Sequence, residues 1–428
     1  MRSPGRAEQN PVNRERIAVV GAGVAGLTAA HLLQRRHDVL LFEAEPRLGG
    51  HAHTHDVDTG TDTLAVDTGF IVHNERTYPN LLRLFGELGV RTQDSDMSMS
   101  VRCLGCGLEY AGARGPRGLF PTPGSLGRPR YLRMLTEVTR FHRHARRVLA
   151  ERDDGATLGT FLTTGRYSGY FRDHFLLPMV SAVWSAPEHV SRDYPARYLF
   201  EFLANHGLLS VGGSPQWRTV TGGSREYVER AVKNLTAVRV GTPVRAVHRH
   251  ADHVEVRDDA DEPHRVDRVV LATHADQALE LLADPTEAET EVLGAFRYSR
   301  NETWLHTDAT LLPRTAGARA SWNYLKTTCA GGERVLVSYD LTRLMRLDPR
   351  TRHVVTLNAT DRIAPDRVLA RMTYEHPVYT RESVAAQRRL PELAGPRTAF
   401  AGAYHGWGFH EDGCAAGVRA AEHFGAGW

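Results

Sequence analysis

Short apolar runs and a helical stretch follow one another near the N-terminus. Residues 16–20 (RIAVV) are apolar and β-branched and stop at a glycine, which predicts a buried parallel strand. Residues 27–36 carry apolar side chains at helical spacing, and residues 38–42 form a second apolar run. A strand, a glycine turn, a helix and a second strand within about 30 residues predict a βαβ unit.

Helical periodicity dominates the middle of the chain. Residues 80–89 and 131–151 are amphipathic, and residues 158–209 have a largely helical pattern. The Gly- and Pro-rich stretch 111–129 is expected to be loop, and residues 220–232 predict a loop and then a helix with Ser224 as N-cap. Further along we expect a hairpin at 238–256, a buried strand at 266–273, strand pieces of a mixed or antiparallel sheet at 303–379, a strand at 398–402 and a last helix at 411–424.

Elements of the βαβ kind therefore occur at both ends of the chain and in its middle. We expect an α/β fold with a discontinuous Rossmann-like nucleotide domain and an inserted mixed α+β substrate domain. The nucleotide domain is predicted at residues 15–75, 215–285 and 395–428, the substrate domain at 76–214 and 286–394, and a disordered tail at 1–14.

Composition narrows the classes of function. The hydrophobic fraction is 41%, without the run of about 18 apolar residues that a transmembrane helix needs. The polar first residues do not form a secretory signal, and four cysteines make no disulfide framework, so we expect a cytoplasmic protein. The net charge of +3 does not suggest a nucleic-acid partner. The chain contains two lysines, Lys233 and Lys326, which leaves few positions for a catalytic lysine.

A glycine motif lies between the first predicted strand and helix. Gly21 permits a tight turn, Gly23 lets the backbone approach a pyrophosphate, and Gly26 allows the helix to pack closely on the strand. Glu43 ends the second strand, where a carboxylate accepts hydrogen bonds from both ribose hydroxyls and repels a 2′-phosphate, which disfavours NADP. The predicted dinucleotide contacts here are Gly21, Gly23, Val24, Ala25, Gly26 and Glu43.

The residues after Glu43 distinguish FAD from NAD. Arg47, Gly49 and Gly50 in EPRLGGH form an R-x-G-G extension that resembles the flavin-containing amine oxidase superfamily, in which it wraps the FAD pyrophosphate. The segment Asp67-Thr68-Gly69-Phe70 follows at that family's usual distance and would line the flavin pocket. The resemblance implies FAD, and the absence of a family attachment motif implies that it is bound non-covalently.

Two further segments resemble the same superfamily. A glycine pair precedes the helix at 225–232, and Val244 then lies on a strand whose backbone would contact adenine. The C-terminal FAGAYHGWGFHEDG resembles the last flavin segment, where the dipole of a helix beginning near Glu411 stabilises the reduced ring. The other FAD contacts that the resemblance implies are Ala44, Arg47, Gly49, Gly50, His51, Thr68, Gly69, Phe70, Ala272, Gly402, His410, Asp412 and Gly413.

A narrower resemblance runs along nearly the whole chain. RLGGHAHT, VDTGFIVHNERTYPNL, SAVWSAP and YHGWGFHEDG resemble, in order, a bacterial group of FAD-binding proteins linked with cyclopropane-fatty-acid synthases. It implies hydride transfer between flavin N5 and an apolar substrate such as a fatty acyl chain, by desaturation or reduction, with a lipid methyltransferase as functional neighbour. Trp184, Tyr324, Tyr404 and Trp407 are candidates for the substrate channel, and Tyr404, His405 and His410 for catalysis.

Several interpretations stay open. A flavin amine oxidase usually carries a lysine that holds a water near N5, but residues 297–308 contain none. The sequence is also compatible with a redox-neutral isomerase of the UDP-galactopyranose mutase type and with a flavin-binding accessory subunit. The arginines of residues 131–151 favour a solvated face or contact with an anionic membrane. Cys103-x-x-Cys106 resembles half a zinc knuckle, but zinc needs a second pair of ligands, so no metal is expected.

Overall fold

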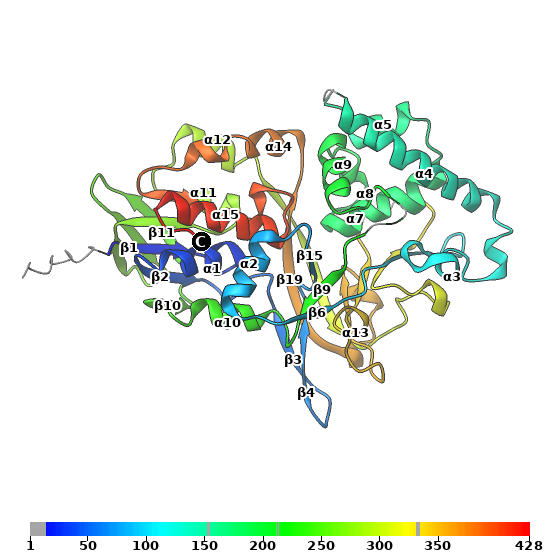
Figure 1. Ribbon diagram of the computed structural model, residues 1–428, viewed down its shortest axis with the longest axis horizontal. Helices are drawn as coiled ribbons and strands as arrows, with labels where there is room; N and C mark the ends of the chain where they lie inside the picture. Colours follow the sequence, from blue (N-terminus) through cyan, green and yellow to red (C-terminus); the bar gives the residue numbers. More distant parts are fainter. Residues whose placement is uncertain (1–13, 152–154, 211, 213, 331–333) are drawn as a thin grey trace, which may run out of the picture.

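The computed structural model describes residues 14–151, 155–210, 212, 214–330 and 334–428, and it contains a parallel sheet with the order β10-β2-β1-β14-β20. In this sheet Ile17 pairs with Val39 on one side and with Arg268 on the other. The α/β class is confirmed, because this parallel sheet is packed with helices (Figure 1). Its strands come from segments that are far apart in sequence. Its strands are β1 (Arg16–Val20), β2 (Asp38–Glu43), β10 (Ala237–Val240), β14 (Arg268–Leu271) and β20 (Thr398–Phe400).

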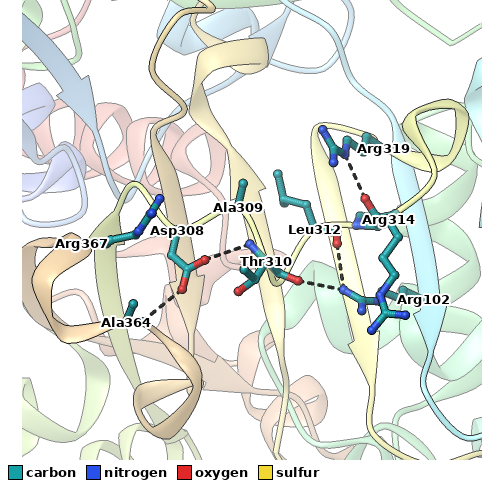
Figure 2. A pocket seen from close by; sticks show the side chains of 10 residues that line it. Arg102, Asp308, Ala309, Thr310, Leu312, Arg314, Arg319, Ala364 and Arg367 are labelled. Carbon is teal, nitrogen blue, oxygen red and sulfur yellow. Dashed lines mark hydrogen bonds between the residues drawn. The ribbon is translucent and has the colours of Figure 1, made fainter.

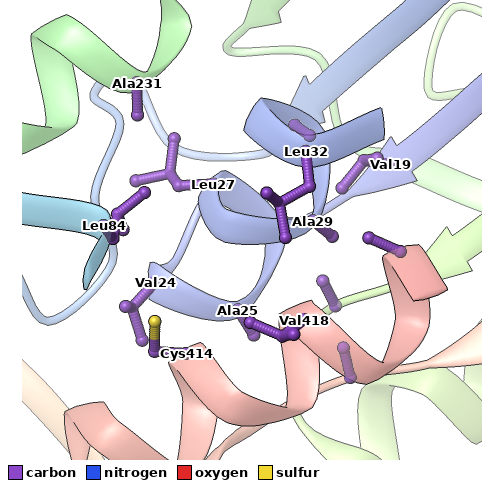
Figure 3. Packing of buried hydrophobic residues seen from close by; sticks show 14 of the residues in the cluster. Val19, Val24, Ala25, Leu27, Ala29, Leu32, Leu84, Ala231, Cys414 and Val418 are labelled. Atoms are coloured by element: carbon purple, nitrogen blue, oxygen red, sulfur yellow. The ribbon is translucent and has the colours of Figure 1, made fainter. Parts of the chain in front are cut away.

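Helices cover one face of the parallel sheet. Alternate strand residues such as Ile17 and Val19 pack under α1 (Val24–Leu33), α2 (Pro79–Leu88), α10 (Arg225–Val232) and α15 (His410–His423). Figure 3 shows α15 lying against α1, with Val418 beside Ala25. The helices approach this closely because Gly417 has no side chain: a Cβ there would lie 2.3 Å from the Ala25 carbonyl oxygen.

The other face of the sheet packs against smaller elements. The alternate residues Ala18, Val20, Leu40 and Phe42 lie in a second cluster with Tyr404. The elements here are an antiparallel sheet of β11 (Val244–Arg249), β12 (Val254–Asp258) and β13 (Pro263–Val266), and the helices α11 (Ala275–Leu281), α12 (Glu287–Leu293), α14 (Arg381–Gln387) and η7 (Leu390–Leu393).

A larger mixed sheet runs in the order β19-β15-β18-β17-β16-β7-β8. Only β16 and β7 pair in parallel in this sheet as described, and its other neighbours are antiparallel. Its strands are β7 (Met99–Cys103), β8 (Leu108–Ala111), β15 (Arg297–His306), β16 (Trp322–Lys326), β17 (Val337–Asp340), β18 (Val354–Leu357) and β19 (Val368–Val378). The helices packed beside it are α4 (Pro129–Ala150), α5 (Leu158–Thr164), α6 (Gly169–Phe171), η3 (Arg172–Leu176), α7 (Leu177–Trp184), α8 (Glu188–Ser191) and α9 (Ala196–Asn205).

Some local expectations were wrong. The stretch 111–129 holds η1 (Gly112–Arg114), α3 (Gly115–Leu119) and η2 (Pro123–Ser125) and is not simply loop. Ser224 is the N-cap residue of α10 as predicted, but its hydroxyl donates to Asp67 (2.8 Å) and makes no capping bond to the helix. The pattern at 238–256 divides between β10 and the hairpin of β11 and β12.

The remaining elements are β3 (Thr54–Asp58), β4 (Thr63–Asp67), β5 (His73–Asn74), β6 (Thr92–Asp94), β9 (Trp217–Val220), α13 (Leu341–Leu344), η4 (Ala316–Ala318), η5 (Thr360–Arg362), η6 (Pro365–Arg367) and η8 (Ala403–His405).

The predicted division into domains stays a prediction. Helix α2 falls in the predicted substrate segment 76–214, yet its Leu81, Leu84 and Phe85 pack in the cluster around α1. Of the predicted tail, residues 1–13 lie outside the described residues, and Arg14 Nε donates to Asp38 (2.8 Å). Within the described ranges, no helix combines the length and the apolar character needed to cross a membrane.

Candidate functional site

The glycine turn after β1 positions the start of α1. The N–H of Gly21 donates to the carbonyl of Phe42 (2.8 Å), and a Cβ on Gly26 would lie 1.9 Å from the Gly21 carbonyl oxygen. Gly23 is the N-cap of α1, and a Cβ added there would meet nothing within 4 Å. The open space therefore lies at a helix N-terminus, where Val24 and Ala25 begin the first turn and backbone N–H groups attract anions.

A second loop lies over this turn. The Glu43 carboxylate accepts a hydrogen bond from the N–H of Ala22 (2.8 Å), which fixes it at the carboxyl end of β2. Arg47 Nη1 donates to the Gly50 carbonyl (2.7 Å), and a Cβ on Gly50 would lie 3.2 Å from the Gly23 Cα. The R-x-G-G segment thus stacks on the glycine turn, and Gly49 continues the contact by donating its N–H to the Ala22 carbonyl (2.9 Å).

Other predicted nucleotide contacts lie around the same turn. The N–H of Thr242 donates to the Glu43 carbonyl (2.8 Å), which brings the start of β11, with Val244, beside the end of β2. Ala272 follows β14, and its carbonyl oxygen lies 2.8 Å from the place where a Cβ on the first glycine of the motif would be. Ala44, next to Glu43, is exposed.

The segment at Thr68 to Phe70 packs against His51. The Phe70 N–H donates to the His51 carbonyl (2.7 Å), and a Cβ on Gly69 would lie 2.2 Å from that same oxygen. The hydroxyls of Thr68 and Tyr374 are 2.7 Å apart. Tyr374 lies on β19 and carries no recognised motif, so the motifs could not identify it as part of this site.

Histidines from three chain segments surround His51. The rings of His51 and His376 are 5.4 Å apart, and His51 Nε2 is buried without a partner. Burial lowers the pKa of His376 to about 4, and burial together with the neighbouring histidines holds the pKa of His51 well below its usual range. Burial also lowers the pKa of His274. These imidazoles are therefore neutral at physiological pH and provide hydrogen-bonding groups without charge.

The C-terminal segment meets this group through His410. Its ring stacks on Phe70 (centroids 3.7 Å apart), and its Nε2 lies 3.0 Å from the hydroxyl of Tyr227. Burial lowers the pKa of His410 to about 3, so it is a neutral ring held between two partners. The Glu411 carboxylate accepts a hydrogen bond from the side chain of Asn80 on α2 (2.7 Å).

The next two residues of α15 have packing and capping roles. Asp412 accepts a hydrogen bond from the Phe409 N–H (2.9 Å), and burial raises its pKa to about 7. Gly413 lies against α1, since a Cβ there would be 2.7 Å from Val24 Cγ1. Thus Glu411, Asp412 and Gly413 hold α15 in place, and their predicted role as direct flavin contacts stays a prediction.

Aromatic rings continue from His410 into the helical part of the molecule. Phe202 stacks on Phe409 (5.0 Å) and packs on Trp184 (4.7 Å). Trp184 Nε1 donates to the carbonyl of Trp407 (3.0 Å), and the hydroxyls of Tyr198 and Tyr379 both donate to the carbonyl of Gly406 (2.8 Å each). We call Trp184, Tyr198, Phe202, Tyr379, Trp407 and Phe409 the aromatic wall.

The candidate channel residues are only partly brought together. Trp184 and Trp407 meet in the aromatic wall, and Tyr324 packs in the same hydrophobic cluster. Tyr404 lies in the cluster on the other face of the parallel sheet, against Phe296 (5.2 Å), so its side chain is separate from the other three. Its neighbour His405 is half-buried, and its Nε2 atom is buried without a hydrogen-bond partner.

A separate cavity of about 690 Å³ opens on the mixed sheet (Figure 2). Its polar groups bond to one another: Asp308 accepts from the N–H groups of Thr310 (2.9 Å) and Ala364 (3.1 Å), and Arg102 donates to the carbonyls of Thr310 and Leu312 (2.9 Å each). It contains none of the predicted site residues, so we do not place the reaction there.

Comparison with known families indicates which cofactor the glycine turn binds. Residues 24–423 match the family described as flavin containing amine oxidoreductase. The chain belongs to this family. It is accordingly a member of a family of flavin-containing oxidoreductases, and the open space at Gly23, the carboxylate of Glu43 and the unpartnered Nε2 of His51 fit FAD.

Relatives within and around the flavin-containing family differ in their named substrates. AofH of Mycobacterium tuberculosis, named as a flavin-containing monoamine oxidase, is 31% identical over 269 residues, which cover 59% of this chain and 56% of AofH. The chain therefore matches just over half the length of that relative. Cyclohexylamine oxidase from Brevibacterium oxydans has a TM-score of 0.68 at 16% identity, covering 96% of this chain and 98% of that one. A CLA-producing fatty acid isomerase from P. acnes has a TM-score of 0.67 at 16% identity, covering 97% and 100%. These two structures share the fold of the flavoprotein.

Proposed function

We propose that this flavoprotein transfers hydride between flavin N5 and a carbon of an apolar substrate, a modified fatty acyl chain, in desaturation or reduction. The observation that carries the proposal is the aromatic wall. The polar atoms of Trp184, Tyr198 and Tyr379 bond to backbone carbonyls, and the Nε1 of Trp407 is buried without a partner. The wall therefore offers mainly ring faces, and none of its members carries a charge.

The wall is linked to the predicted flavin contacts through consecutive residues of the C-terminal segment. Phe409 is followed in sequence by His410, which stacks on Phe70, and Phe70 bonds to the backbone of His51. FAD, when bound, supplies the hydride acceptor or donor. The rings would exclude water and hold an acyl chain for hydride transfer, which needs a near-attack distance of about 3–3.5 Å in a water-poor site. The neutral histidines beside them add no charge that an apolar chain would have to avoid.

Amine oxidation is the second candidate, and it has support of its own. AofH is named for it, and the buried Glu188 Oε2 has no hydrogen-bond partner. That oxygen could receive an ammonium group, which needs a carboxylate or an aromatic cage. Against this candidate, Lys326 is already bound to Glu188 Oε1 (2.6 Å), and β15 carries no lysine.

A redox-neutral isomerisation is the third candidate. Its support is the likeness in fold to the fatty acid isomerase. It differs from the first proposal in one measurable respect, because the flavin returns to its starting redox state without an external electron acceptor.

Stopped-flow flavin spectroscopy tests these candidates. The oxidised and the reduced holoprotein are each mixed with phospholipids that carry modified acyl chains, and with common mono- and polyamines. Bleaching or reoxidation of the flavin by a lipid supports the proposal. Rapid reduction by an amine, or no redox change with any lipid, contradicts it, and lipid conversion without an electron acceptor supports the isomerase. Replacing Phe202 with Ala should raise KM for the lipid, whereas the same change at Phe141, a core ring outside the wall, should not.

A further inference from the structure

Four potential metal ligands from three segments of the chain meet at one end of the mixed sheet. They are Cys103, Cys106, His174 and Cys329, and their ligand atoms all lie within 4.8 Å of one another. Cys103 ends β7, Cys106 is in the turn before β8, and Cys329 follows β16, which pairs in parallel with β7. His174 comes from η3, on the helical side.

The spacing of these atoms matches tetrahedral zinc. The sulfur atoms of Cys103 and Cys329 are 3.8 Å apart, and Cys106 Sγ lies 3.5 Å from His174 Nε2. With Zn–S of about 2.3 Å and Zn–N of about 2.0–2.1 Å, a tetrahedron has S–S edges of about 3.8 Å and S–N edges of about 3.5 Å. A direct disulfide would require the two sulfurs to move to about 2.05 Å.

The imidazole of His174 is already oriented as a ligand. Its Nδ1 lies 3.3 Å from the carbonyl of Tyr170, so Nδ1 carries the proton and Nε2 presents a lone pair to Cys106. The Tyr170 ring stacks on the imidazole (4.1 Å), which fixes the plane of the ring. The helix is of the π type at this point, and such local widenings frequently occur at functional sites because they redirect a side chain.

Two glycines set the conformation of the turn that carries Cys103 and Cys106 and allow Cys329 to approach it. The Gly107 N–H donates to the Cys103 carbonyl (2.9 Å), and Gly107 has a φ of +66°, which favours glycine. A Cβ on Gly105 would lie 2.9 Å from the backbone nitrogen of Cys329, so this residue lets the third cysteine approach. Arg128 donates to the carbonyls of Cys106 and Gly107 (2.9 and 3.1 Å) and brings a positive charge beside the thiols.

We propose that Cys103, Cys106, Cys329 and His174 bind one zinc ion, which ties the mixed sheet to the helices packed beside it. Each of the three thiols gives its proton to solvent, and the resulting ligand set leaves one net negative charge beside Arg128. Because protein ligands fill all four positions, the ion is structural and does not activate a water. Cys329 is exposed, which gives the ion access from solvent.

Elemental analysis of the FAD-bound protein, expressed with zinc in the medium, tests the proposal. We expect one zinc per chain in the wild type and in Cys414→Ser, a matched control at a buried cysteine on α15. Cys106→Ser and His174→Asn should lose the zinc and lower Tm while FAD remains bound. Zinc retained by both of these variants would overturn the assignment.

Two measurements on the wild type test the same proposal in case the variants do not fold. Wild type prepared with cobalt in place of zinc should show the absorption of tetrahedral thiolate-bound cobalt at wavelengths longer than the flavin bands. Denatured wild type without metal should expose all four cysteine thiols to a thiol reagent. The absence of both metal and cobalt absorption, or a count of two thiols from a Cys103–Cys329 disulfide, would contradict the proposal.

Discussion

Lys326 and Glu188 form an ion pair of 2.6 Å between side chains that are each only 2% exposed. Replacing Lys326 with Met should leave the carboxylate buried without its cation and destabilise the protein by about 3–5 kcal/mol. The measurement is the shift of the urea unfolding midpoint at constant FAD.

The double variant separates loss of the pair from loss of one partner. Lys326→Met with Glu188→Gln removes both charges, keeps an acceptor for the hydroxyl of Tyr324, and should recover most of the stability. A double variant as unstable as the single one would mean that packing around the lysine stem, and not charge, explains the loss.

Acid precipitation should release intact FAD into the supernatant, because no attachment motif is evident and the cofactor is expected to be non-covalent. The check is the flavin absorbance of the supernatant and of the pellet, with chromatography against FAD. Yellow colour that stays with the precipitated chain would refute the non-covalent mode.

Glu43→Gln should weaken FAD binding by roughly tenfold or more, since a carboxylate bond to ribose is typically worth about 1.5–3 kcal/mol. Fluorescence titration of the apoprotein gives the Kd. Glu45→Gln is the matched control, because this neighbouring carboxylate is exposed and pairs with Arg47 (2.9 Å). An equal Kd for wild type and Glu43→Gln would place the carboxylate away from the ribose.

Gly417→Ala should destabilise the protein by about 1–3 kcal/mol, because a Cβ there would lie 2.3 Å from the carbonyl oxygen of Ala25 on α1. Gly86→Ala on α2 is the matched control, since its Cβ would meet nothing within 4 Å, and it should gain about 0.5–1 kcal/mol. Thermal unfolding measures both. If both variants gain stability equally, α1 and α15 do not pack as closely as described.

The buried His306 should make the protein sensitive to acid. Burial lowers its pKa to about 4, while both ring nitrogens bond, to the Thr356 hydroxyl and the Asp308 N–H (2.7 and 3.1 Å). The pKa of His306 is about 6.5 in the unfolded chain and about 4 in the folded protein. Below pH 6.5 the unfolded chain therefore binds more protons than the folded one, and the free energy of unfolding falls as the pH drops from about 6.5 to about 4.

His306→Gln supplies similar hydrogen bonds without titrating, and its loss of stability over the same window should be smaller by on the order of 2 kcal/mol. The exposed His250→Gln is the control and should follow the wild type. The measurement is Tm from pH 7 down to the lower end of the window. Parallel curves for all three proteins would show that His306 is not the group responsible.

The N-terminal βαβ unit could be predicted from sequence because its signals are local. The run at 16–20, the glycine motif and Glu43 lie within one short segment, and the structure has β1, α1 and β2 there. The hairpin of β3 and β4 was missed because both strands are short and THDVD carries a single apolar residue, Val57, so the apolar face of Leu64 and Val66 on β4 is not repeated on its partner.

The site was only partly predictable because its other residues come from distant segments. Tyr374 and His376 alternate on β19 and face the same side, so period-two spacing could have suggested them, but no motif marks that strand. His174 and Cys329 approach the cysteine pair only through the pairing of β16 with β7 and the placement of η3, which no local spacing encodes.

The place of β20 and α15 in the parallel-sheet domain has a consequence for biosynthesis. At about 5–20 residues per second, the interval between translation of β1 and of β20 is roughly 20–80 s. Throughout it, the edge of β14 is unpaired and the apolar surface of α1 is uncovered, both of which promote aggregation. A nascent chain that stops before residue 398 can complete neither, so the parallel sheet and the packing of α1 are finished only after both segments have been synthesised.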